Sequence, residues 1–163
     1  MNEPGEALTL VVDDREIRSG LADALIAAGQ RVAVARLPVG DVEIGPRVIV
    51  ERKTVDDWVT SILDGRLWQQ CWTLIGVARR PLIVVEGRDA APFLRVSPEV
   101  LRNALITVVV SYRIPILRTD DVHETAFTLA TIADRERRRA ARRPDPEPPL
   151  AGRVALDVLG AIP

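Results

Sequence analysis

The sequence predicts an α/β fold of three layers, α/β/α, with a central mixed sheet, because segments with strand periodicity alternate with segments with helix periodicity. Two short apolar runs rich in branched residues, at 8–12 and 81–85, are typical of buried strands. Gly45 and Pro46 separate two further strand-like segments and predict a hairpin. A chain of 163 residues with 47% hydrophobic content can bury the core of one such domain.

The individual elements follow from periodicity and from the residues that interrupt it. We expect strands at residues 8–12, 31–37, 41–44, 47–51, 81–85 and 114–117. We expect helices at residues 17–28, 54–63, 66–78, 98–112 and 121–139. Thr54 has the side chain of an N-cap, with Asp57 three residues later, and glycines follow two of the helices.

The folded domain is expected to occupy residues 1–140, and residues 141–163 to lie outside it. After residue 143 the string PDPEPP has neither helix nor strand period and predicts an extended linker. The apolar stretch at 154–162 is too short to fold alone. No segment has the length of a membrane span and the first residues lack the features of a signal peptide, so we expect a soluble intracellular protein with no membrane partner.

The cysteine and histidine content restricts the kind of metal site that the chain can build. One cysteine excludes an intramolecular disulfide, and His123 is the only histidine, so a zinc cluster of cysteines and histidines is excluded as well. Any catalytic metal must therefore be held by carboxylates.

Charge is unevenly distributed although the formal net charge is only −1. Residues 134–143 carry six arginines against two acids, a local excess of +4. This run is equally compatible with a solvated helix end and with contacts to phosphate groups. Carboxylates gather instead between residues 13 and 57.

The most informative string begins at Gly40-Asp41 and continues to Glu51, Lys53 and Asp57. If the predicted hairpin forms, the carboxylates of Asp41 and Glu51 meet at one edge of the sheet, where two oxygens suit a hard divalent ion such as Mg²⁺. Alternation along a strand puts Glu51 and Lys53 on the same face. Lys53 is the only lysine among 22 basic residues, which favours a chemical role for its ammonium group.

Several roles remain open from the residues alone. An ammonium beside a metal-bound water can orient the water, assist its deprotonation or stabilise transition-state charge. Asp57, one turn into the next helix, can bind the lysine, a water or a second ion. Acids and bases at strand ends are also common in α/β proteins, so the spacing by itself leaves a purely structural role open.

Four strings of the chain, in matching order, resemble the XPF family of structure-specific endonucleases, which includes the Hef type and belongs to the PD-(D/E)xK superfamily. The string GDVEIGPRVIVERKTVDD is similar to the GD-xn-ERK-xxx-D signature of that family. The strings VVDDREIRSGLADAL, SILDGRLWQQC and RPLIVVEG resemble its other segments. Coverage runs from about residue 8 to residue 133, and every position of the core signature is filled.

The resemblance implies a restriction-endonuclease-like fold and a role for each matching residue. Catalytic roles are implied for five residues: Asp41, Glu51, Arg52, Lys53 and Asp57. Metal binding is implied for three: Asp41, Glu51 and Asp13. Substrate contacts are implied for four: Arg15, Glu16, Arg66 and Gln70. For Arg66 an ordinary surface ion pair is an equally good interpretation.

The implied activity is hydrolysis of DNA phosphodiester bonds near junctions of duplex and single strand, at 3′-flaps or forks, with Mg²⁺ or Mn²⁺, by a homodimer that acts on branched DNA. The protein would be cytoplasmic and associated with the nucleoid in a prokaryote, and nuclear in a eukaryote. The end of the chain resembles the opening of a helix-hairpin-helix motif. Two rivals remain: a non-catalytic DNA-binding or dimerisation subunit of the same family, and another kind of PD-(D/E)xK nuclease.

Overall fold

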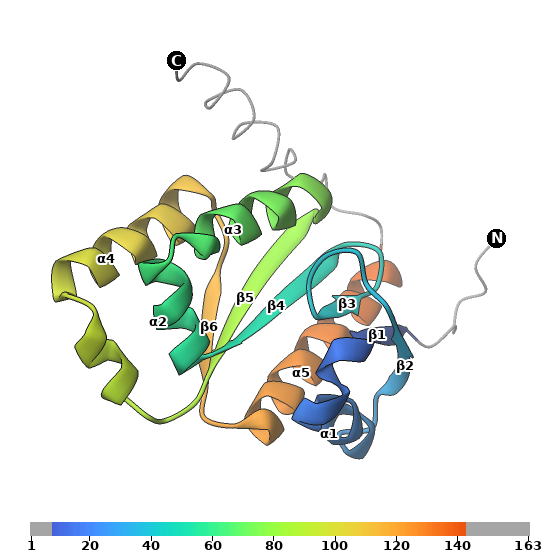
Figure 1. Cartoon of the computed structure of the whole chain (residues 1–163). Helices are drawn as coiled ribbons and strands as arrows, with labels where there is room; N and C mark the ends of the chain where they lie inside the picture. The colour runs from blue at the N-terminus through green and yellow to red at the C-terminus, as the bar shows by residue number, and fades with distance from the viewer. Residues whose placement is uncertain (1–7, 143–163) are drawn as a thin grey trace.

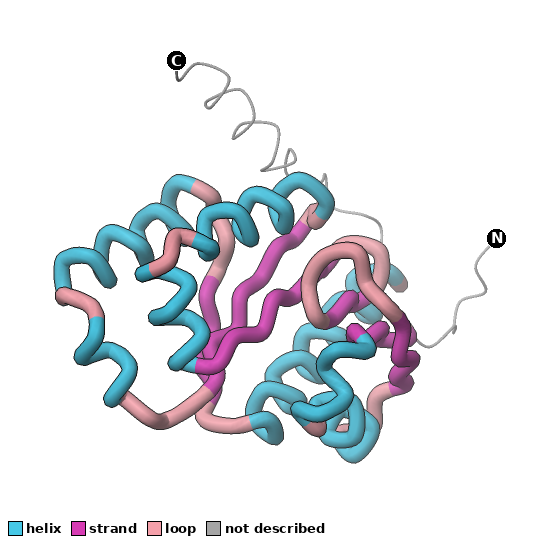
Figure 2. The backbone as a smooth tube through the Cα atoms, viewed as in Figure 1, coloured by secondary structure: helices cyan, strands magenta, loops and turns pink. Residues whose placement is uncertain are grey.

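The computed structural model describes residues 8–142, which form a mixed sheet of six strands with helices on both faces (Figure 1). The strand order is β2-β1-β3-β4-β5-β6. Strands β1 and β2 pair in parallel, as do β4 with β5 and β5 with β6, whereas β3 pairs antiparallel with both β1 and β4. Strand β3 therefore runs against the other five. The predicted three-layer α/β/α fold is confirmed (Figure 2).

All six predicted strands are present, with shifted ends. They are β1 (Thr9–Asp13), β2 (Arg31–Ala35), β3 (Val42–Ile44), β4 (Val48–Thr54), β5 (Arg80–Glu86) and β6 (Ile116–Thr119). The change at β4 matters most, because this strand continues three residues beyond its predicted end at Glu51. Lys53 consequently lies inside the strand, opposite Val85 of β5.

The helices are divided between the two faces of the sheet. They are α1 (Leu21–Ala27), α2 (Val55–Leu63), α3 (Arg66–Val77), α4 (Pro98–Ile106) and α5 (Val122–Ala140). Helices α2, α3 and α4 cover one face, and α1 and α5 cover the other (Figure 1). Thr54 caps α2 as predicted, since its hydroxyl oxygen accepts a hydrogen bond of 3.1 Å from the amide of Asp57.

Two predicted helices are interrupted in the structure, and one short element was not predicted. The segment predicted as one helix from residue 17 begins as a 3-10 helix, Asp14–Ser19, which ends at Gly20 in the left-handed conformation (φ +77°) before α1. Helix α4 ends at Ile106 and continues as one turn of π-helix, Thr107–Ser111. The unpredicted element is a second 3-10 helix, Ala91–Arg95, in the loop after β5.

Alternation along β4 gives the two helical layers separate apolar cores. Val48 and Val50 pack with Leu82, Val84 and Leu129 under α1 and α5. On the opposite face, Ile83 and Val85 of β5 pack with Trp58, Leu67 and Leu74 under α2 and α3. The thiol of Cys71 is buried in the same cluster. The polar residues that interrupt these apolar patterns near the end of β4 are therefore the candidates for chemistry.

Within residues 8–142 no helix is both long enough and apolar enough to cross a membrane. The predicted linker and the apolar stretch at 154–162 lie outside the described residues, so the domain boundary at residue 140 stays a prediction.

Candidate active site

Asp41 is held between two strands by backbone and side-chain hydrogen bonds. Its amide donates to the carbonyl of Val50 at 2.8 Å, and its carbonyl accepts from the amide of Asp13 at 2.8 Å. Its carboxylate oxygen Oδ2 accepts from the amide of Arg52 at 2.8 Å. These three contacts bring the carboxylate of Asp41 from the start of β3 to the last residues of β4.

Gly40 makes this close approach of the chain to β4 feasible. Its φ of +76° lies in the left-handed region, and a Cβ at this position would clash with the side chain of Ile49 and lie 3.1 Å from the carbonyl oxygen of Val50. Only glycine fits this position without strain, so Gly40 allows Asp41 to lie against β4. This explains why a glycine precedes the aspartate in the GD part of the motif.

We predict that Gly40→Ala destabilises the protein by about 1–3 kcal/mol, because alanine meets both a backbone strain and a steric clash. Denaturant unfolding monitored by tryptophan fluorescence measures the change. Gly29→Ala is the matched control: Gly29 also has a positive φ, of +83°, but an added Cβ there meets nothing within 4 Å. A loss of stability no larger for Gly40→Ala than for Gly29→Ala would show that the close packing at Gly40 is unimportant.

Glu51, Lys53 and Asp57 form a chain of charged contacts on the α2 and α3 face. The ammonium Nζ of Lys53 lies 3.6 Å from Oε1 of Glu51 and 3.2 Å from Oδ2 of Asp57. Its side chain is only 2% exposed. A buried ammonium costs free energy unless it is paired, so the two carboxylates hold Lys53 in one position.

The electrostatics of Asp41 and Glu51 favour a bound cation. Burial is the main cause that raises the pKa of Asp41, to about 7, and the negative charge of Glu51 adds to the increase. The pKa of Glu51 is also raised, again mainly by burial, although Lys53 opposes the increase. Two buried carboxylates that repel one another are stabilised by a cation between them.

The carboxylates of Asp41 and Glu51 are the kind of ligands that a hard divalent cation such as Mg²⁺ takes. Among residues 8–142 no group of three or more histidine, cysteine, aspartate or glutamate side chains is arranged to hold a metal. Mg²⁺ commonly takes only one or two protein carboxylates and completes its octahedron with waters and phosphate oxygens. Asp41 and Glu51 fit that requirement and do not fit a closed structural metal site.

Asp57 links the lysine to helix α3. Its second oxygen, Oδ1, accepts a hydrogen bond of 2.9 Å from Nη2 of Arg66. Burial would raise the pKa of Asp57, but the positive charges of Lys53 and Arg66 outweigh it and lower the pKa. Asp57 is thus an ionised bridge between the buried Lys53 and the half-exposed Arg66.

Arg52 lies on the other face of the sheet, as strand alternation requires. Its guanidinium donates to Oε2 of Glu86 at 2.9 Å and to Oε2 of Glu16 at 3.0 Å. Glu86 also accepts a hydrogen bond of 2.6 Å from the hydroxyl of Thr125 on α5. The resemblance implies a catalytic role for Arg52 and substrate contact for Glu16, but in the structure Arg52 binds both Glu16 and Glu86. Glu86 and Thr125 were missed, because nothing in their local sequence indicates a partner on β4.

The carboxylate of Asp13 accepts hydrogen bonds from Arg15 and from the backbone, although the resemblance implies that Asp13 is a metal ligand. Its fully buried carboxylate accepts from the Arg15 amide at 2.9 Å, from Nε of Arg15 at 2.6 Å and from the amide of Leu37 at 2.7 Å. The hydrogen bond from the Arg15 side chain is the largest cause of a strongly lowered Asp13 pKa. Asp13 therefore orients Arg15, whose positive charge also acts on Asp41 and Glu51.

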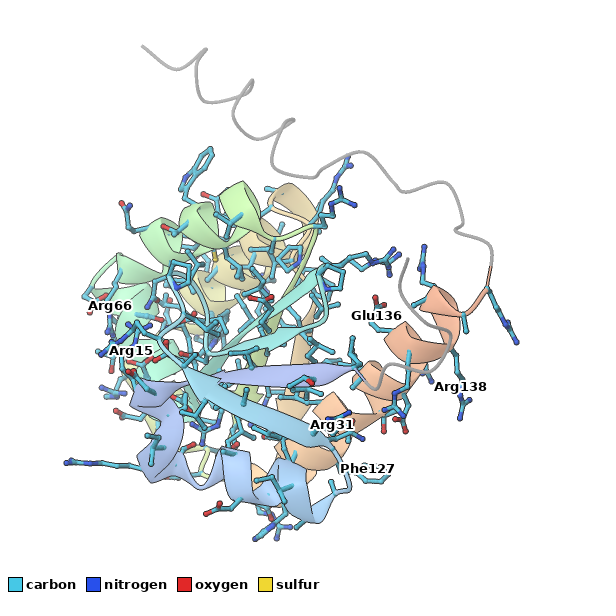
Figure 3. The ribbon with its side chains drawn as sticks, turned by 90° about the vertical axis from the view of Figure 1, so that its right-hand side faces the viewer. Arg15, Arg31, Arg66, Phe127, Glu136 and Arg138 are labelled. Carbon is cyan, nitrogen blue, oxygen red and sulfur yellow. The ribbon has the colours of Figure 1, made fainter. Side chains whose placement is uncertain are left out.

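Two further predicted residues lie on one face of α3. Arg66 and Gln70 are four residues apart in this helix. The side-chain carbonyl oxygen of Gln70 is buried and accepts no hydrogen bond. Arg15 and Arg66 lie on the same side of the molecule, away from Arg138 and Glu136 (Figure 3). The exposed cations thus flank the buried carboxylates.

Comparison with known proteins agrees with the motifs. The chain matches the family model described as the ERCC4 domain over residues 12–132. It is 34% identical over 130 residues to the 3′-flap repair endonuclease Xpf of Saccharolobus solfataricus, an alignment that covers 78% of this chain and 55% of the relative. The chain spans between about a tenth and about half of the length of the curated relatives it matches.

Solved structures give the same result for the fold. XPF from Aeropyrum pernix superposes with a TM-score of 0.77 at 30% identity, over 95% of this chain and 75% of that chain. The same protein in complex with DNA superposes with a TM-score of 0.74 at 29% identity, over 96% and 74% of the two chains. The resemblance stated from the motifs is confirmed: this chain belongs to the ERCC4 domain family, the family of the XPF-type nuclease domains.

Proposed function

We propose that this chain is the catalytic domain of a structure-specific DNA endonuclease. It hydrolyses phosphodiester bonds near junctions between duplex and single strand, such as 3′-flaps and forks, and acts in DNA repair. The observation that carries the proposal is the convergence of Asp41, Glu51 and Lys53 at one end of the β3–β4 hairpin. The named activity of the Saccharolobus solfataricus relative supports the choice of substrate.

Asp41 and Glu51 would hold Mg²⁺ or Mn²⁺, and the bound ion would lower the pKa of a coordinated water and neutralise charge on the scissile phosphate. Lys53 orients the attacking water and stabilises negative charge in the transition state. Asp57 keeps the ammonium of Lys53 in place and positions Arg66. Attack of water on phosphorus leaves 5′-phosphate and 3′-hydroxyl ends.

The remaining predicted residues bind DNA or support those that do. Arg15, Arg66 and Gln70 contact the substrate, since two are exposed cations and the third lies one turn after Arg66 on the same face of α3. Asp13 orients Arg15 and takes no part in metal binding in this proposal. Glu16 and Arg52 join β4 to the first 3-10 helix. An enzyme of this kind acts in the cytoplasm of a prokaryote, in association with the nucleoid, or in the nucleus of a eukaryote.

Cleavage of end-labelled 3′-flap, fork and linear duplex DNA, compared side by side, tests the proposal. We expect cutting of the branched substrates with Mg²⁺ or Mn²⁺ and none in EDTA. If the protein binds the branched DNA but cleaves none of it with any metal, it is a non-catalytic subunit of the same family and the proposal is wrong. Equal cleavage of the linear duplex would indicate another kind of PD-(D/E)xK nuclease.

We further propose that the domain forms a homodimer through the outer face of α4 and the π-helical turn. A hollow of about 610 Å³ there is lined by nine apolar residues and one arginine: Trp58, Val85, Phe93, Leu101, Leu105, Ile106, Val109, Val110, Ile116 and Arg118. Val110 is 66% exposed and Ile106 is 49% exposed. Contiguous exposed apolar surface of this kind is typical of an interface. Pairing with a second copy of the chain would remove this surface from water.

We predict that Val110→Glu converts the protein to a monomer, because a carboxylate buried in an apolar interface lacks a partner. Sedimentation equilibrium measures the change in mass. Val77→Glu is the control, since Val77 is 56% exposed at the end of α3 and does not line the hollow. An equal effect of the two substitutions, or a Val110→Glu protein with unchanged mass, would refute this interface.

A further inference from the structure

A buried polar network joins helix α5 to the end of strand β4. The hydroxyl oxygens of Thr119 and Thr125 lie 2.7 Å apart, and Thr125 donates to Oε2 of Glu86 at 2.6 Å. Glu86 also accepts from Nε of Arg52 at 2.9 Å and from Nη2 of the same guanidinium. Both threonines are buried, and the two charged side chains are each 11% exposed. The network is therefore almost closed to water.

The hydrogen bonds between the hydroxyl groups run in one direction, toward Glu86. An ionised carboxylate only accepts hydrogen bonds, so the single hydroxyl hydrogen of Thr125 goes to Glu86. Thr119 must then donate to Thr125. Each bond in such a chain polarises the next one and strengthens it. The two threonines thus fix the carboxylate of Glu86, whose two oxygens bind the planar fork of the Arg52 guanidinium.

The end of β4 extends beyond its partner strand β3, and Asp41 takes the place of that strand. The last paired residues of the two strands are Val42 and Val50. Two positions later, the amide of Arg52 donates to Oδ2 of Asp41 instead of to a strand. The position of this amide therefore sets the rotation of the Asp41 carboxylate. Its other oxygen, Oδ1, accepts no hydrogen bond from residues 8–142 and remains for a cation.

We propose that Glu86 and Thr125 are positioning residues of the metal site. In this proposal neither residue binds metal or DNA. They fix the side chain of Arg52, and Arg52 then presents its amide to Asp41. The inference rests on the proposed function in that it takes Asp41 and Glu51 as the ligands of Mg²⁺ or Mn²⁺. Removal of a group that orients a metal ligand typically weakens metal binding by about 10–100-fold.

A positioning role and a purely stabilising role have different consequences. A residue that only stabilises the fold changes the free energy of unfolding, but not the affinity of the folded protein for a metal ion. A positioning residue changes this affinity, and a variant that restores the hydrogen bond restores the affinity. Thr125 allows the comparison, because valine has nearly the same shape without the hydroxyl, whereas serine keeps the hydroxyl.

Titration of the metal-free protein with Mn²⁺, followed by electron paramagnetic resonance without DNA, tests the proposal. The Asp41→Asn protein measures the Mn²⁺ that binds elsewhere. We expect Glu86→Gln to weaken binding at the Asp41 site by at least about tenfold, since glutamine keeps the size of the side chain but has one acceptor oxygen and no charge. We expect Thr125→Val to weaken it by a smaller factor and Thr125→Ser to restore it.

Thr131→Val is the matched control for Thr125→Val. Thr131 also lies on α5, but it is exposed, and its hydroxyl donates to the carbonyl of Phe127 at 2.9 Å. We expect this variant to bind Mn²⁺ as tightly as the unsubstituted protein. Urea unfolding of each variant shows whether it is folded during the titration. Glu86→Gln and Thr125→Val change the network independently, so one folded variant of the two is sufficient for the test.

The proposal is overturned if the folded Glu86→Gln and Thr125→Val proteins bind Mn²⁺ as tightly as the Thr131→Val protein, whatever their stability. Cleavage of flap DNA over a series of Mg²⁺ concentrations separates this inference from the proposed function. A protein that binds Mn²⁺ with the expected order of affinities but cuts no DNA retains the positioning role alone. A protein that cuts DNA, with a metal affinity independent of Glu86 and Thr125, retains the proposed function alone.

Discussion

Replacing Asp41 by asparagine is expected to reduce cleavage and raise metal-free stability at the same time. Asparagine has the size of aspartate and keeps an oxygen that can accept the 2.8 Å hydrogen bond from the amide of Arg52. It is a far weaker ligand for Mg²⁺, so we expect the cleavage rate to fall by at least about 10³-fold, which corresponds to about 4 kcal/mol of transition-state stabilisation. Single-turnover cleavage of flap DNA at saturating Mg²⁺ measures the loss.

The gain in stability follows from the pKa of Asp41, which burial raises from 3.8 to about 7. Between these two values the folded protein keeps a proton that the unfolded chain releases, so metal-free stability falls as pH rises from about 4 to about 7 and stays low above that. The asparagine side chain does not ionise, and the Asp41→Asn protein lacks this loss. We expect it to be more stable than the unsubstituted protein at pH 8 by on the order of 2 kcal/mol.

Urea unfolding in EDTA at several pH values between 5 and 8 tests this part of the prediction. Mg²⁺ should reverse the order of stability, because a ligand that binds only the folded state stabilises only the protein that binds it. Asp23→Asn is the control, since it removes one exposed carboxylate from α1. Two results would count against a cation site at Asp41: unchanged cleavage by the Asp41→Asn protein, or the same pH dependence of unfolding in the Asp41→Asn and unsubstituted proteins.

Replacing Arg52 by methionine is expected to cause the largest loss of stability among the site residues. The side chains of Arg52 and Glu86 are each 11% exposed and that of Glu16 is 17% exposed, so all three charges are largely withdrawn from water. Removal of one member of a buried charged group costs about 3–5 kcal/mol, because the partners keep the cost of burial without the attraction. Chemical unfolding at pH 7 measures this loss.

The pH dependence of the Arg52→Met protein separates a broken ion pair from a packing defect. Burial raises the pKa of Glu86, but the hydrogen bonds from Arg52 and Thr125 outweigh it and lower the pKa. The resulting stability is present above pH 4.5 and is lost as pH falls through the lowered pKa. The difference between the two proteins should therefore shrink in acid.

A second substitution provides the control for Arg52. In the Arg52→Met protein, Glu86→Gln removes the unpaired charge and should recover part of the stability, whereas in the unsubstituted protein it should only destabilise. An Arg52→Met protein that is as stable as the parent but cannot cut DNA would instead support the catalytic role that the family resemblance implies for Arg52.

Strand alternation and a hairpin turn made much of the site predictable. Gly45 and Pro46 predict the β3–β4 hairpin, and period-two geometry puts Glu51 and Lys53 on one face with Arg52 on the other. The predicted cap at Thr54 is confirmed, and it places Asp57 within 3.2 Å of Lys53. These contacts are local, within about one turn of helix or two strand positions, so local rules suffice for them.

The end of β4 and the partners of the charged residues were not predictable in the same way. The polar string from Glu51 to Lys53 looks like a strand end, but pairing with β5 carries β4 on to Thr54. Arg52 binds Glu86, 34 residues away, and Asp13 binds the amide of Leu37, 24 residues away. Such pairs depend on which strands become neighbours, and strand order is not encoded in local periodicity.

The amino-acid sequence by itself determined the alternating α/β elements, the acids and the lysine of the candidate site, and the family to which the chain belongs. The tertiary structure decided that Arg52 and Asp13 are bound by other residues and that Gly40 allows Asp41 to approach β4. The physical reason is that periodicity and turn residues act over a few positions, whereas burial and pairing of charges depend on segments that only the folded sheet brings together.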